Sequence, residues 1–147
     1  MKRKVNAPIR ELLRVFEFCS DEMTYYLNIE TGKVAMYSNL SGGFDEEGNE
    51  ITDSHAFASK KYVEISGTHS YEVFRDMERF VESVPVPELK EKLTAVLKEK
   101  GAYRRFKESL STYSEVQTQW LNFRKKCLLD RIHNWLEEND LELLEHD

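Results

Sequence analysis

The sequence predicts an α+β fold, and three observations lead to this prediction. Apolar and polar side chains alternate in two arms over residues 23–38, which is typical of a β-hairpin. From residue 70 onward, apolar residues recur every three or four positions, as in amphipathic helices. A chain of 147 residues can bury a core without disulfides or a metal ion. We therefore expect one domain, residues 1–147, with an N-terminal helix and a small antiparallel β-sheet packed on a C-terminal bundle of about four helices.

The N-terminal helix is expected to begin after Asn6, whose side chain suits a helix cap, with Pro8 in its first turn. Ile9, Leu12 and Phe16 then fall on one side of the helix. The helix is expected to end near residue 20. It therefore offers one apolar face to a core.

The β-hairpin has its two arms on either side of Gly32, a residue that can adopt a positive φ. The alternation places Tyr26 and Tyr37 on one face, where we expect them to pack against a helix. Residues 61–66 alternate in the same way and form a candidate third strand. Residues 39–56 are rich in Gly, Asn, Asp and Glu and are expected to form an acidic surface loop.

The four helices of the C-terminal half are expected at residues 70–84, 87–100, 102–110 and 115–138. Gly101 follows a lysine and is a typical signal for the end of a helix. Ser114 and Gln117 fit a capping box at the start of the last helix. Residues 140–147 form an acidic tail that is expected to fray.

The overall charge and hydropathy exclude several classes of protein. The formal net charge is −6, which argues against general affinity for nucleic acids or acidic membranes. No apolar run approaches the ~18 residues of a membrane span, and residues 1–5 do not begin a signal peptide. Cys19 and Cys127 lie on predicted apolar helix faces and are expected to be reduced, inert thiols. We therefore expect a cytoplasmic protein.

The segment K-E-K-G-A-Y-R-R-F-K at residues 98–107 is the local feature that indicates a ligand, with five basic groups against one glutamate. The N-terminus of a helix beginning after the glycine would attract anions through its free N–H groups and its dipole. The candidate anion-binding residues are Lys100, Gly101, Arg104, Arg105 and Lys107. The alternative is a solvated face whose lysines lie at the preceding helix end and whose arginines pair with nearby carboxylates, and this alternative is the commoner outcome for charged stretches.

No other motif in the sequence indicates a catalytic, metal-binding or phosphate-binding site. The four histidines are scattered and form no paired metal-ligand motif with each other or with cysteine. The acidic loop fails the calcium-binding EF-hand pattern, because Glu50 stands at the place of its invariant glycine. No G-x-S-x-G or phosphate-binding glycine motif occurs. We therefore assign no catalytic residue, no metal site and no cofactor.

Three segments resemble motifs of uncharacterised protein family 0158, a bacterial family: G-A-Y-R-R-F-K at 101–107, W-L-N-F at 120–123 and W-L at 135–136. The segment Y-Y-L-N-I-E-T-G at residues 25–32 is similar to a hairpin motif of that family, with Asn28 where Asp is commoner. Tyr103 likewise stands where Phe is commoner. The resemblance covers most of residues 23–137 and implies no reaction, substrate or cofactor.

The expected function is that of a non-enzymatic binding or adaptor domain with a protein partner, because the apolar pattern is regular and the charge is gathered in separate patches. Its contact surfaces are expected at the basic segment, the hairpin edge and the acidic tail. The alternative is a protein that binds an anion, a nucleotide or RNA through residues 100–107. An enzyme with an unfamiliar site ranks last.

Overall fold

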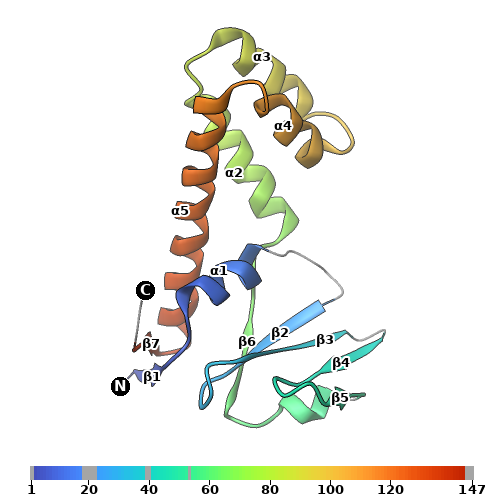
Figure 1. Cartoon of the computed structure of the whole chain (residues 1–147), viewed down its shortest axis with the longest axis vertical. Helices are drawn as coiled ribbons and strands as arrows, with labels where there is room; N and C mark the ends of the chain where they lie inside the picture. The colour runs from blue at the N-terminus through green and yellow to red at the C-terminus, as the bar shows by residue number, and fades with distance from the viewer. Residues whose placement is uncertain (1, 18–22, 39–40, 53, 145–147) are drawn as a thin grey trace. The chain divides into compact units, whose positions relative to one another are not determined.

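The computed structural model describes residues 2–17, 23–38, 41–52 and 54–144. Contacts divide the chain into two compact units (Figure 1). The first, which we call the sheet unit, comprises Met1–His69 and Leu128–Asp147, and the second, the helical unit, comprises Ser70–Cys127. Helices and an antiparallel sheet are both present, so the predicted α+β class is confirmed. That the chain forms a single domain stays a prediction.

The sheet of the first unit has five antiparallel strands in the order β5-β4-β3-β2-β6. Its centre is the predicted hairpin, formed by β2 (Met23–Asn28) and β3 (Val34–Ser38). The candidate third strand is confirmed as β6 (Tyr62–Ile65), which pairs with β2. Gly32 has a φ of 76°, and a Cβ there would lie 1.9 Å from the carbonyl oxygen of Asn6. Only glycine therefore fits this turn.

Residues 39–56 differ from the predicted surface loop, because part of this segment adds two strands to the sheet. These are β4 (Gly42–Phe44) and β5 (Glu50–Ile51), and a short 3-10 helix, η1 (Ser54–Phe57), follows them. Gly43 allows the close pairing of β4 with β3, since a Cβ there would lie 2.1 Å from a backbone oxygen of β3. Residues 39–40 and 53 lie outside the described part.

The acidic tail also differs from the prediction. Leu141–Leu143 form β7, which pairs in parallel with β1 (Arg3–Val5), a strand that the sequence pattern did not indicate. The two strands are held because Val5 and Leu141 are fully buried, and burial of apolar side chains outweighs the fraying expected of an acidic end. Residues 145–147 lie outside the described part.

The core of the sheet unit lies between the sheet, α1 (Ile9–Glu17) and the second half of α5 (Ser114–Glu138). The Phe16 and Trp135 rings meet edge to face at 5.9 Å, and the Trp135 Nε1 donates to the carbonyl oxygen of Glu64 at 2.8 Å. The last helix of the predicted bundle is thus the one that contributes to the core of the sheet. The predicted end of α1 and Cys19 fall outside the described residues.

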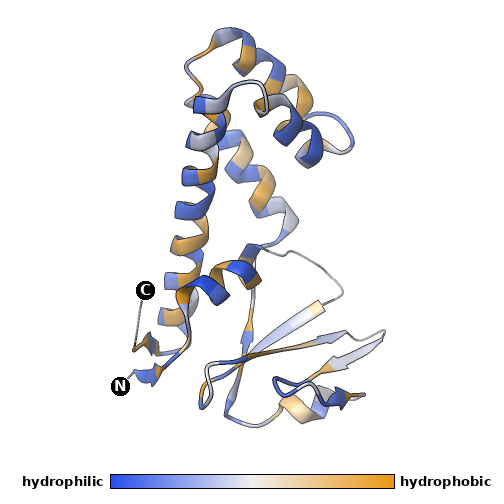
Figure 2. Cartoon of the chain, in the orientation of Figure 1, coloured by the Kyte–Doolittle hydropathy of each residue, from blue (hydrophilic) through white to orange (hydrophobic). Residues whose placement is uncertain are grey.

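The helical unit consists of α2 (Ser70–Glu82), α3 (Pro87–Val96), α4 (Ala102–Leu110) and the first half of α5. All four helices were predicted, but α2 and α3 end at Glu82 and Val96, before the expected residues 84 and 100. Each helix has both apolar and polar residues on its surface, as expected of amphipathic helices (Figure 2). The α5 helix begins at Ser114 rather than after it, because the N–H of Gln117 already donates to the carbonyl of Tyr113 at 2.9 Å.

The core of the helical unit is built from aromatic rings. Phe106 and Trp120 meet at 5.0 Å and Phe80 and Trp120 at 5.4 Å, which fixes α4 and α2 against α5. The buried apolar residues therefore form one main cluster in each unit, where the sequence had indicated a common interior for the sheet and the helices.

Candidate interaction surfaces

The basic segment lies at the start of α4 in the helical unit, as predicted. Gly101 precedes the helix with a φ of 70°, and its carbonyl accepts the first helical hydrogen bond, from Arg105 N–H at 3.1 Å. A positive φ is costly for residues with a Cβ, so glycine suits this position. Lys100, Arg104, Arg105 and Lys107 are all exposed around this turn.

The two arginines of the segment pair with carboxylates of their own unit. Arg105 Nη1 bonds Glu99, and Arg104 Nε lies 3.5 Å from Glu108 one turn further along α4. These pairs follow the alternative interpretation of the segment, in which the arginines meet nearby acids. Exposed ion pairs of this kind contribute about 0–1 kcal/mol, so the arginines can exchange partners at little cost. An anion-binding role for the five predicted residues stays a prediction.

One further cation, Arg124 of α5, joins this segment in the structure. The Nζ of Lys107 lies 5.1 Å from the centre of the Tyr103 ring, and the Cζ of Arg124, on α5, lies 5.4 Å from the same centre. The sequence analysis missed Arg124. The run Arg124-Lys125-Lys126 was visible in the sequence, but nothing in it showed that α5 lies beside α4. We use the name cationic face for Lys100, Arg104, Arg105, Lys107 and Arg124.

The two units carry opposite net charge. Residues 70–127 hold twelve Lys and Arg against nine Asp and Glu, a net +3, whereas the remaining residues hold nine against eighteen, a net −9. The overall charge of −6 is therefore the sum of a basic helical unit and a strongly acidic sheet unit. The potential around each unit has its own sign, and each unit attracts ligands of different charge.

An apolar row crosses the sheet and reaches the surface. Strand pairing places Ile65, Tyr25, Met36 and Phe44 opposite one another on β6, β2, β3 and β4 in turn. Directly opposed residues share one face of a sheet. Ile65 is buried in the core, but Met36 is 42% exposed and Phe44 53% exposed. We call Tyr25, Val34, Met36 and Phe44 the apolar strip.

A hollow of about 310 Å³ lies beside the apolar strip. The α1 residues Glu11, Arg14 and Val15 line it on one side, and Tyr25, Val34 and Met36 line it on the other. Glu11 and Arg14 form an ion pair one helical turn apart at its edge. At the far end of the apolar row, exposed Glu50 on β5 stands opposite Phe44. The strip is thus apolar at its centre, with the acidic Glu50 at one end and the Glu11–Arg14 ion pair at the edge of the hollow beside it.

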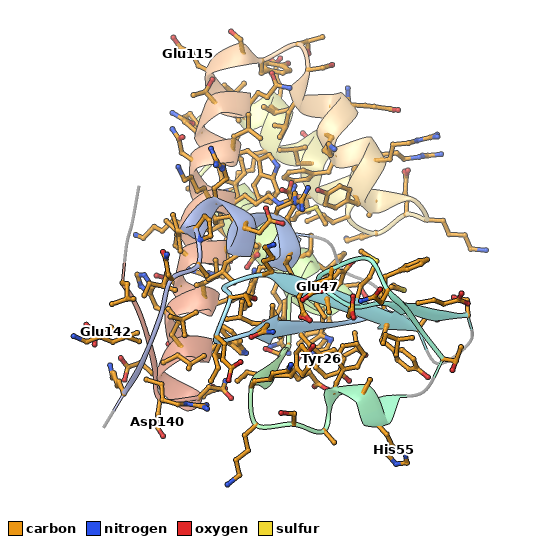
Figure 3. The ribbon with its side chains drawn as sticks, turned by 60° about the horizontal axis from the view of Figure 1, so that its bottom comes forward. Tyr26, Glu47, His55, Glu115, Asp140 and Glu142 are labelled. Carbon is orange, nitrogen blue, oxygen red and sulfur yellow. The ribbon has the colours of Figure 1, made fainter. Side chains whose placement is uncertain are left out.

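The opposite face of the sheet is closed by η1. Tyr26 and Phe57 stack with their ring centres 4.3 Å apart, and Tyr37 and Tyr62 meet the edges of Phe57. Figure 3 shows Tyr26 among the side chains between the strands and η1, whereas His55 points away from them. Tyr26 and Tyr37 therefore pack against a helix as expected, although this helix is a single short turn.

A hydrogen-bond network joins three segments on this face. Glu46, in the turn between β4 and β5, accepts from Asn28 Nδ2 at 3.1 Å and from the Tyr62 hydroxyl at 3.0 Å. Asn28 Oδ1 in turn accepts from the N–H of Glu30 at 2.9 Å in the hairpin turn. Burial, the hydrogen bond to Glu46 and its negative charge all raise the pKa of Tyr62 well above its ordinary value. The Glu46 carboxylate has its acceptors occupied, which indicates a structural role.

A second hollow, of about 300 Å³, lies in the sheet unit beside β7. Its lining combines apolar Leu136 and Leu141 with Lys2, His133 and Glu137. Lys2 pairs with Glu137, which raises the pKa of the exposed Lys2 ammonium. Among the described residues, no three His, Cys, Asp or Glu side chains are placed to hold a metal ion.

A known protein family matches almost the whole length of this chain. The profile of the Uncharacterised protein family UPF0158 matches residues 5–147. The chain belongs to UPF0158. The family resemblance seen in the sequence is thereby confirmed, while the basic motif as a mark of the family stays a prediction.

This UPF0158 chain is 26% identical over 140 residues to the UPF0158 protein PA5073 of Pseudomonas aeruginosa, covering 95% of this chain and 87% of that protein. No solved structure matches the chain. Among the described residues, no helix has the length and apolar character needed to cross a membrane.

Proposed function

We propose that this UPF0158 protein is a non-enzymatic, cytoplasmic adaptor that binds a protein partner through the apolar strip of its sheet unit. The observation that carries the proposal is the cross-strand row in which Met36 and Phe44 continue the core to the surface. Contiguous exposed apolar side chains are unfavourable in water and commonly mark an interface. We include a cytoplasmic location in the proposal because a buried cysteine thiol such as that of Cys127 stays reduced in that compartment.

The chemistry of the partner follows from the groups around the strip. Glu50 stands opposite Phe44, and the whole sheet unit has a net charge of −9, although Glu11 at the hollow is balanced by Arg14. A complementary partner therefore presents one or two apolar side chains flanked by Lys or Arg. The hollow of about 310 Å³ is large enough for one such side chain. Attraction between the opposite charges would favour this orientation over others.

Selection of random peptides displayed on phage tests the proposal with the full chain as bait. We expect the selected peptides to combine apolar residues with Lys or Arg. A variant with Met36→Lys and Phe44→Lys should lose them, because it places cations on the strip. A matched variant with Tyr71→Lys and Leu121→Lys changes two exposed apolar residues of the helical unit and should retain them. Selection of acidic peptides, or equal binding by both variants, would contradict the proposal.

A further inference from the structure

The cationic face has more positive charge than its own carboxylates can balance. Residues 98–108 and 124–126 together hold eight Lys and Arg against two Glu. Both glutamates, Glu99 and Glu108, are already paired with Arg105 and Arg104. The two short segments therefore carry a net formal charge of +6, although the chain as a whole is acidic. Gathering like charges is unfavourable, so their concentration here points to a ligand that would offset it.

The fold holds these cations in place from two helices. Tyr103 lies between α4 and α5, with Lys107 and Arg124 both within 5.4 Å of its ring centre. Phe106 of α4 and Trp120 of α5 pack against each other in the core of the helical unit. This contact fixes the two helices that carry the cations. Cation–π contacts restrict the long side chains that make them. Restriction of Lys107 and Arg124 by the Tyr103 ring lowers the entropic cost of fixing these two side chains on a ligand.

We propose that the cationic face binds the phosphodiester backbone of a nucleic acid. Several cations spread over two helices suit a ligand with evenly repeated negative charges, and Arg offers two-pronged contacts to phosphate. The net −9 of the remaining residues would repel the same ligand and so confine it to this face. This inference is independent of the apolar strip, and a variant with Met36→Lys and Phe44→Lys should still bind.

Fluorescence anisotropy of the full chain with labelled oligouridine, oligothymidine and duplex DNA tests this inference and distinguishes RNA from DNA. We expect binding of at least one probe at low salt. Reversing two charges, with Lys107→Glu and Arg124→Glu, should weaken it by about tenfold or more. The slope of log affinity against log salt should become shallower by about 1.4 for a single strand, because two phosphate contacts are lost.

The matched control reverses two exposed lysines that are not among the residues of the cationic face, with Lys33→Glu on the sheet unit and Lys92→Glu on α3, and gives the same net charge. It should change affinity by less than about twofold. Circular dichroism reports whether each variant folds. If Lys107→Glu with Arg124→Glu does not, the single change Lys100→Glu at an exposed turn residue replaces it and should weaken binding by several-fold.

Three results would overturn the inference. The first is no binding of any of the three probes at low salt. The second is an equal loss in the control, which would show attraction by overall charge alone. The third is binding to phosphatidylglycerol vesicles without binding to nucleic acid, which would assign the face to an anionic membrane surface.

Discussion

At the scale of single residues, the hydroxyl of Tyr62 shows how one side chain can fix a turn. It donates to Glu46, and Glu46 also accepts from Asn28, so that β6, β2 and the β4–β5 turn are joined through one carboxylate. Asn28 is almost fully buried, and an unpaired amide there would be costly. The network therefore couples the local conformation of the hairpin turn to that of the acidic turn.

The raised pKa of Tyr62 predicts a loss of stability at alkaline pH. Because the folded-state pKa exceeds the unfolded value of 10.0, the stabilisation is complete below pH 10 and is lost as the pH rises toward the folded pKa. Tyr62→Phe should lower the free energy of unfolding by about 1 kcal/mol at pH 7 and make its fall above pH 10 less steep. Urea titrations at several pH values measure both effects.

Tyr71→Phe provides the control, since Tyr71 is exposed on α2 and lies outside the network of Tyr62, Glu46 and Asn28. It should leave the alkaline profile as in the unsubstituted protein. An unchanged profile in Tyr62→Phe would contradict the role given to the network.

The sequence predicted part of this residue-scale detail. Gly32 was expected to allow a positive φ, and it has one, because a glycine in a hairpin turn is a local signal. Gly101 was expected to end a helix, but it instead precedes α4, also with a positive φ. The contact between Asn28 and Glu46 was not predicted, since it joins residues 18 positions apart and depends on how the strands pair. The contact of Arg124 with Tyr103 was missed because it depends on the packing of α5 against α4.

At the scale of elements, helices were easier to predict than short strands. Each helix of the helical unit has a spacing of three or four between apolar residues, and the whole signal lies within the element. The strands β1 and β7 have three residues each and lie at opposite ends of the sequence. Neither is long enough for alternation to be visible, so only the pairing itself reveals them.

The pairing of β7 with β1 predicts that Leu141 is a stabilising residue. Leu141 is 1% exposed in the sheet core, and Leu141→Ala should lower the free energy of unfolding by about 2–4 kcal/mol through the cavity that it leaves. Leu144→Ala, at a residue that is 47% exposed, should change it by less than about 1 kcal/mol. Urea unfolding measures both. Equal, small effects would show that the end of the chain frays in solution, as the sequence had suggested.

At the scale of the whole molecule, the main difference from prediction is the number of cores. Amphipathic faces predict that a helix buries an apolar side, but they do not specify which other element covers it. The apolar residues of α2, α3 and α4 cover one another and the first half of α5, whereas the sheet is covered by α1 and the second half of α5. The interaction surfaces follow this division, with the apolar strip on one unit and the cationic face on the other.

Because the sheet unit and the helical unit each have a main core cluster, we predict that a core substitution destabilises mainly the unit that contains it. Phe106→Ala should speed amide hydrogen exchange most in α2–α4, and Leu27→Ala should speed it most in β2 and β3, because each removes a fully buried side chain from one cluster. Exchange followed by mass spectrometry resolves the two regions. If either variant speeds exchange equally throughout, the chain unfolds as one cooperative domain, as the sequence had indicated.

The two tryptophans of the chain are divided between the two clusters, Trp120 in the helical unit and Trp135 in the sheet unit. When tryptophan is excited selectively, the fluorescence of this protein therefore arises from one indole in each unit. Substitution of either tryptophan with Phe leaves a chain whose tryptophan fluorescence reports on a single unit. A ligand that reaches only one unit can then be located from the spectrum of the unlabelled protein.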